Sequence, residues 1–192
     1  MKVTNKVFKE NEVEFLLKAK SRTLKSVDLI VVARDNLGWN TARIHINDDI
    51  NIDLNNNLES IVIDEFGNSD EFGILSLDRS SNKVLELADV CENASTFIIN
   101  KRIKDVLLVE DTISVFGNEK KVSELSYVQA IAFDLEDGFL VLDKETWFSE
   151  MIAIKEGNDL QELIYDDSAN WEDSIEDDPT THYEFNSKIV KL

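Results

Sequence analysis

The residues of this sequence that are best suited to chemistry lie near its C-terminal end, where carboxylates are mixed with aromatic side chains. From Glu156 to Glu184 the chain has eleven Asp and Glu residues and no Lys or Arg. Aromatic anchors supply affinity at protein interfaces, and the charge around them raises the rate of association. We therefore predict that this stretch binds a protein partner through Tyr165, Asp166, Asp167, Trp171, Glu172 and Asp173.

These aromatic residues have a second interpretation, in which they only hold the acidic segment against the core. Trp171 fits both interpretations equally. Tyr183 and Phe185 alternate with polar residues as in a half-buried strand, so we assign them to the core.

A second polar group has the spacing of a calcium-binding loop. Asp53, Asn55 and Asn57 occupy its first, third and fifth positions, but Leu58 stands where the loop needs glycine, and the twelfth position is Asp64 rather than Glu. We predict an ordinary polar loop here and no metal site. The acidic C-terminal stretch could bind divalent cations weakly, but nothing in its pattern indicates the converging ligands of a dedicated site.

Catalytic motifs are missing from the sequence. It has no G-x-S-x-G, no phosphate-binding glycine loop and no dinucleotide fingerprint, and its one cysteine, Cys91, is far in sequence from His45 and His182. We predict a protein that is not an enzyme and that uses no cofactor. A hydrolase that works with Asp and Glu alone, or a simple scaffold, stays open as an alternative.

The charge of the chain is strongly negative and unevenly distributed. The whole chain has 20 basic and 39 acidic residues, a net charge of −19. Residues 1–104 have 14 basic and 17 acidic side chains (−3), whereas residues 105–192 have 6 and 22 (−16). Such a field attracts basic surfaces and repels phosphates, so we expect a basic protein partner and no direct binding to nucleic acid. Solubility alone is the other explanation of the charge.

The acidic stretch follows a β-hairpin that we expect to position it. Asp137-Gly138 is typical of a two-residue type I′ turn, which predicts that Leu135 faces Leu140 and Phe133 faces Leu142. Residues 147–154 are apolar enough for a third strand that ends at Gly157. Residues 160–165 fit one or two helical turns, residues 166–181 an exposed acidic loop, and residues 183–185 and 189–190 a return to the sheet edge.

The rest of the chain predicts many strands and few helices. Residues 10–20 fit a strand or a helix, and we favour a strand; 47–57 is predicted to be a loop, and 80–92 a helix. Residues 122–127 carry no clear pattern. Further strands are predicted at residues 27–33, 39–46, 60–66, 72–78, 96–99, 106–109 and 113–116. We therefore expect an α+β fold: one domain over residues 1–192, built on a largely antiparallel sheet.

No stretch is long and apolar enough for a membrane helix, and the first residues do not resemble a signal peptide. With a single cysteine, no disulfide can form within the chain, which suits a reducing compartment. We expect a cytoplasmic protein that does not bind membranes.

In its general character the chain resembles an immunity protein of a bacterial toxin–immunity system, such as contact-dependent growth inhibition. The likeness lies mainly in residues 128–184: the Asp137-Gly138 hairpin, the strand at 147–154 and the acidic aromatic stretch. The resemblance implies a non-catalytic protein that binds a cognate basic toxin, often a nuclease, and blocks its active site or substrate entry. The alternative is an acidic nucleic-acid mimic that inhibits a DNA-binding or restriction enzyme.

Overall fold

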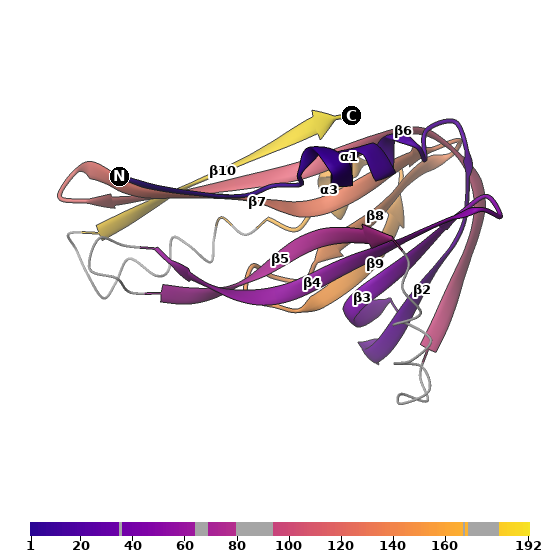
Figure 1. Cartoon of the computed structure of the whole chain (residues 1–192), viewed down its shortest axis with the longest axis horizontal. Coiled ribbons are helices and arrows are strands. Elements are labelled where there is room, and N and C mark those ends of the chain that lie inside the picture. The colour runs from indigo at the N-terminus through magenta and orange to yellow at the C-terminus, as the bar shows by residue number, and fades with distance from the viewer. Residues whose placement is uncertain (35, 64–68, 80–93, 167, 169–180) are drawn as a thin grey trace.

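The computed structural model describes residues 1–34, 36–63, 69–79, 94–166, 168 and 181–192 (Figure 1). Strands account for 72% of these residues and helices for 8%. The strands form one sheet that is mixed but mostly antiparallel, as predicted; β1 and β7 are the parallel pair. No helix among the described residues has the length and apolar character needed to span a membrane.

The described part of the chain consists of ten strands and two short helices. In chain order its elements are β1 (Lys2–Lys6), α1 (Glu10–Leu17), β2 (Thr23–Arg34), β3 (Leu37–Ile46), β4 (Ile50–Val62), β5 (Ser69–Arg79), β6 (Ala94–Gly117), β7 (Lys120–Leu135), β8 (Gly138–Lys144), β9 (Met151–Gly157), α3 (Leu160–Leu163) and β10 (Thr181–Lys191).

Strand pairing forms a closed circuit, β6–β7–β8–β9–β3–β2 and back to β6. The 24-residue strand β6 closes the circuit, because its first part pairs with β2 and its second part with β7. Outside the circuit, β1 lies beside β7, β10 lies beside β6, and β4 and β5 extend from β3. Figure 1 shows β6, β7 and β10 as one layer above the layer of β3, β4 and β5.

The length of β6 differs from the prediction of three short strands at 96–99, 106–109 and 113–116. These runs belong to one strand, and the charged residues between them do not interrupt it. Lys101 lies 3.1 Å from Asp137, and Lys104 lies 3.5 Å from Asp134, so these side chains face charges of the β7–β8 hairpin. Residues 122–127, which carried no pattern, belong to β7.

The β7–β8 hairpin is where the sequence placed it, but its register is different. Leu135 pairs with Gly138 and Phe133 with Leu140, so the turn residues are Glu136 and Asp137. Neither has a positive φ, whereas Gly138 has a φ of 139°, so the predicted type I′ turn is wrong. A Cβ on Gly138 would lie 2.5 Å from the carbonyl oxygen of Gly157, which explains the glycine.

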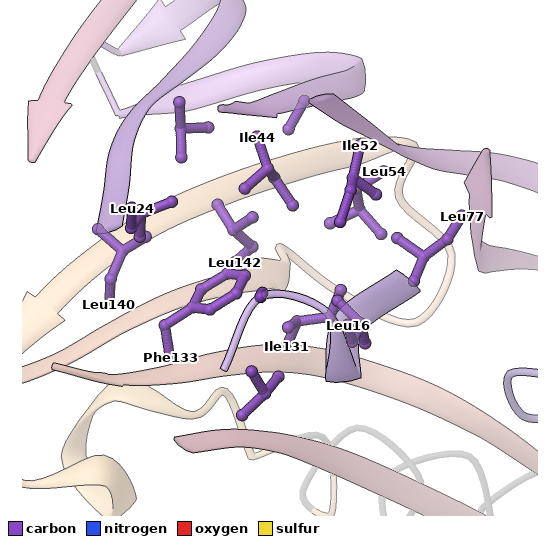
Figure 2. Close-up of a cluster of buried hydrophobic side chains, with 14 of the residues drawn as sticks. Leu16, Leu24, Ile44, Ile52, Leu54, Leu77, Ile131, Phe133, Leu140 and Leu142 are labelled. Atoms are coloured by element: carbon purple, nitrogen blue, oxygen red, sulfur yellow. The ribbon is translucent and has the colours of Figure 1, made fainter. Parts of the chain in front are cut away.

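The main core joins the strands of the circuit to α1 (Figure 2). Leu16 of α1, Ile44 of β3 and Phe133 of β7 are fully buried and turn toward one another in this view. Burial of each such side chain stabilises the fold by about 1.5–3 kcal/mol. Alternation of apolar and polar residues along the strands is what places these side chains on one side.

Residues 10–17 form a helix, so the predicted strand at 10–20 is wrong. The carboxylate of Glu12 accepts the backbone N–H of Lys9 at 2.8 Å and, with its other oxygen, that of Leu77 at 2.8 Å. It therefore caps the start of α1 and satisfies a donor of β5, which pairs within the described sheet only with β4. Tertiary contacts decide between two patterns that the sequence leaves nearly equal.

The predicted loop at 47–57 is also wrong, because most of it belongs to β4. Its polar residues are bonded across the sheet: Arg43 of β3 donates to both carboxylate oxygens of Asp53, at 2.8 and 3.1 Å. Only 5% of Arg43 and 2% of Asp53 is exposed. A polar sequence can thus form a buried strand when a neighbouring strand supplies the opposite charge.

The end of the chain agrees with the prediction in part. The third strand is β9, Met151–Gly157, four residues later than predicted, and it ends at the predicted glycine. The helical turn at 160–165 is confirmed as α3, and the two predicted edge segments form one strand, β10. The predicted helix at 80–92 and nearly all of the predicted acidic loop at 166–181 lie outside the described residues.

Candidate protein-binding surface around Tyr165

Tyr165 is held in place by a buried carboxylate. Asp143 of β8 is fully buried, and its Oδ2 accepts the backbone N–H of Tyr165 at 3.0 Å and the Nζ of Lys155 at 2.5 Å. Its Oδ1 accepts the side-chain amide of Gln129 at 2.9 Å. A residue at the surface is therefore tied to the interior of the sheet.

The strands make room for this carboxylate. Asp143 pairs with Ala130 of β7 on one side and with Ala153 of β9 on the other, so small side chains flank it on the same face. Burial raises the pKa of Asp143, while Lys155, Gln129 and the Tyr165 N–H oppose that rise. Lys155 is therefore paired with a buried carboxylate rather than with a group at the surface.

The helix α3 brings the chain back over this face. Asp159 caps the helix by accepting the backbone N–H of Gln161 at 2.9 Å. Leu160 packs on a small cluster formed by Val109, Ala130, Ala132 and Val141. Because the helix ends at Leu163, Tyr165 emerges beside the helix, with its ring centre 6.0 Å from the Nζ of Lys155.

Two hollows lie on either side of Tyr165. The first, about 360 Å³, is lined by Leu37, Glu145, Ala153 and Lys155 on the side of β3 and β9. The second, about 510 Å³, lies between the α3 segment and β10, which lines it with Phe185, Ser187 and Ile189. Tyr165 lines both hollows and is the residue that they share.

Carboxylates dominate the charge of the chain segment that leads up to Tyr165 and Asp166. From residue 145 to 166 the chain has six carboxylates and one basic residue, Lys155, which is bound to Asp143. Within the part of the chain that the structure describes, none of the six is in an ion pair. They are Glu145, Glu150, Glu156, Asp159, Glu162 and Asp166.

Asp166 is ionised over a wide pH range. The hydroxyl and the backbone N–H of Ser168 lower the pKa of Asp166 by hydrogen bonding, the N–H at 2.9 Å. It is exposed, so its charge acts on whatever approaches Tyr165.

Exposed apolar side chains extend the surface beyond the first hollow. Trp39 pairs with Met151 at the β3–β9 junction, and 43% of it is exposed; Phe148, in the loop before β9, is 53% exposed. Asn40 ties this loop to β3, because its backbone N–H donates to the carbonyl of Glu150 at 2.9 Å. The surface therefore has apolar groups and charge together, as interfaces do.

Among the predicted binding residues the structure describes Tyr165 and Asp166, which are neighbours in the chain and line the same hollow. Asp167, Trp171, Glu172 and Asp173 lie outside the described residues, and their predicted role stays a prediction. Tyr183 and Phe185 pack against a second cluster of buried side chains, which agrees with their assignment to the core.

Sequence reasoning missed Trp39, Phe148 and the hollow-lining role of Phe185. Each lies in a strand or apolar run, where the sequence pattern indicates burial. A signal was present at Trp39, next to Asn40 with its φ of 58°, since Asn readily adopts this conformation at strand irregularities. No local signal distinguishes the exposed Phe148 from the half-buried residues around it.

Other polar groups make internal contacts. His45 on β3 lies 2.7 Å from Asp28 and 2.8 Å from Asn51, while His182 stacks on Phe116 at 4.6 Å between ring centres. Among the described residues, no group of three or more His, Cys, Asp or Glu side chains is arranged to hold a metal ion. Cys91 lies outside the described residues.

A comparison with protein-family models finds no match to this chain, and neither the curated proteins nor the solved structures contain a significant match.

Proposed function

We propose that this protein is a non-catalytic immunity protein, which binds a cognate basic toxin domain of nuclease type and covers its active site or substrate-binding surface. The observation that carries the proposal is the position of Tyr165: a half-buried aromatic residue fixed by Asp143, near the end of a chain segment (residues 145–166) whose six carboxylates form no ion pair among the described residues. A nuclease groove is positive because it binds phosphates, so this surface is complementary to it in charge.

The carboxylates and the aromatic residue Tyr165 contribute to binding in different ways. The carboxylates steer the toxin and raise the association rate, most strongly at low salt. Tyr165 and the apolar residues near Trp39 supply the contacts that distinguish one toxin from another, because few residues carry most of the binding energy at an interface. Fixing Tyr165 in advance lowers the entropy lost on binding.

The direct test takes the product of the gene next to that of this protein as the candidate toxin and measures whether the chain neutralises it. The purified chain should inhibit that toxin at equimolar ratio and should leave an unrelated basic ribonuclease active. Tyr165→Ala should weaken binding by about 2 kcal/mol, measured by calorimetry. Ile98→Ala, which removes an exposed apolar side chain on β6, is the matched control and should bind as the wild type does.

The outcomes separate the alternatives. Equal inhibition of several DNA-binding enzymes would favour an acidic nucleic-acid mimic, because a mimic presents phosphate-like charge rather than a specific anchor. If Tyr165→Ala bound the toxin with wild-type affinity, the surface around Tyr165 would not be the binding site. Turnover of a substrate by the purified chain would overturn its non-catalytic character.

A further inference from the structure

The hollow between the α3 segment and β10 has the chemistry of a site for a cationic side chain. Two aromatic residues, Tyr165 and Phe185, line it together with the carboxylate of Asp166. None of the described residues that line it is a Lys, Arg or His. At about 510 Å³ it also has the size of a pocket that binds a group of atoms rather than a single water molecule.

The strand β10 keeps positive charge out of this hollow. Phe185, Ser187 and Ile189 line it, since alternate residues of a strand point to the same face. Lys188 lies on the opposite face and is bound to Glu110 at 2.9 Å. Lys155, on the other side of the Tyr165 ring, is bound to Asp143. Among the described residues, Asp166 is therefore the charged residue that lines the hollow.

This arrangement favours arginine over other side chains. A guanidinium group is planar, stacks on aromatic rings and donates two parallel hydrogen bonds to a carboxylate. The side chains of Gln161 and Ser187 add hydrogen-bond acceptors at the wall. A purely apolar ligand would leave these polar groups without water, and an anion would be repelled by Asp166.

We propose that the hollow formed by Tyr165, Asp166, Phe185 and Ser187 receives an arginine side chain of a protein partner. As the site of contact with the basic toxin, this assignment rests on the proposed function and gives it a chemical detail: the toxin inserts an arginine here. The arginine side chain lies against the Tyr165 ring, and its guanidinium group pairs with Asp166. The first hollow, which contains Lys155, does not have this preference.

The experiment uses short peptides in place of the toxin. The blocked tripeptide Gly-Arg-Gly is titrated into the ¹⁵N-labelled full chain, and amide shifts are followed by NMR. The matched control peptide has citrulline in place of arginine, which keeps the planar shape but has a carbonyl oxygen in place of one nitrogen and has no charge. We expect the arginine peptide to shift amides of residues 164–166 and 185–189, and the citrulline peptide to bind at least about fivefold more weakly.

Variants of the protein test the individual contacts. Asp166→Asn keeps the shape of the side chain and should weaken the arginine peptide about threefold or more. Asp48→Asn removes the same charge from an exposed turn before β4 and should have no effect. Phe185→Leu keeps an apolar contact with the core and should weaken binding by losing the ring. Unchanged amide shifts in the strands away from each substituted residue show that each variant is folded.

Equal binding of the arginine and citrulline peptides would overturn the assignment, as would shifts confined to another part of the protein. Wild-type peptide affinity of Asp166→Asn would do the same. The two proposals fail in different ways. If the protein inhibits the toxin but does not bind the peptide, only the assignment of the hollow is wrong. If it binds the peptide but inhibits no toxin, only the proposed immunity function is wrong.

Discussion

The carboxylate of Asp143 accepts the backbone N–H of Tyr165 at 3.0 Å, so a fully buried side chain sets the position of a residue at the proposed binding surface. The same oxygen binds Lys155, whose ammonium group also lies over the Tyr165 ring. Stability of the sheet and geometry of the surface are therefore coupled at one carboxylate. Substitution at this position should change both.

Replacing Asp143 with Ala should lower the free energy of unfolding by about 1–3 kcal/mol, because the Tyr165 N–H and Lys155 lose their acceptor inside the protein. Urea unfolding measures the change. Glu156→Ala, at an exposed position of β9, is the control and should stay within about 0.5 kcal/mol of the wild type. Unchanged stability of Asp143→Ala would show that the carboxylate does not fix Tyr165.

The pH dependence of stability should also report on Asp143. Its folded-state pKa is raised above the ordinary value of 3.8 by burial, so the folded state holds this proton more tightly than the unfolded state. Its contribution to stability is therefore greatest below pH 3.8 and is lost as the pH rises through the raised pKa. Asp143→Asn has no such proton, so the stability of the wild type relative to this variant should fall over that pH range. A constant difference would contradict the raised pKa.

Asp105 should show the opposite pH dependence. Its hydrogen bonds to Lys191 and Lys20 lower its pKa below 3.8, so its contribution is present above pH 3.8 and is lost as the pH falls through the lowered pKa. In acid titrations followed by circular dichroism, Asp105→Asn should lack this loss. Asp48→Asn, whose carboxylate is almost fully exposed, should unfold in acid as the wild type does.

Replacing Glu12 should lower the free energy of unfolding more than its position in α1 alone indicates. Glu12→Ala should cost about 2 kcal/mol of unfolding free energy, because two backbone donors, those of Lys9 and Leu77, lose the acceptor they share. Glu14→Ala on the exposed side of the same helix should cost less than about 0.5 kcal/mol. Equal effects of the two substitutions in thermal unfolding would show that Glu12 does not join α1 to β5.

Breaking the buried ion pair between β3 and β4 should lower the free energy of unfolding by a larger amount. Arg43→Ala should destabilise the protein by about 3 kcal/mol, because it leaves the charge of Asp53 buried without its bidentate partner. Arg22→Ala breaks an ion pair with the exposed Asp49 and should cost at most about 1 kcal/mol. A small effect at Arg43, measured by urea unfolding, would show that Asp53 is satisfied without it.

The sequence by itself determined most of the strands and the character of the surface. Alternating apolar residues place β3, β7 and β8, and Gly138 marks the tight turn between β7 and β8, because these are local properties of the backbone and of side-chain periodicity. The excess of carboxylates after residue 105 is likewise a matter of composition, and it indicated a basic partner before any geometry was known. Of the binding residues that the sequence predicts, Tyr165 and Asp166 lie side by side at the described surface.

Only the tertiary structure decided which polar groups face each other. The sequence predicts a loop at Asp53, and only the structure places Arg43 of the neighbouring strand beside it. Likewise, no local pattern indicates that Glu12 of the helix at residues 10–17 accepts the backbone N–H of Leu77 across the fold. The same holds for Phe185, which lines the second hollow only because β10 pairs with β6 near α3. Contacts between residues far apart in the chain depend on the pairing of whole strands, and the periodicity of a single segment contains no information about its neighbours.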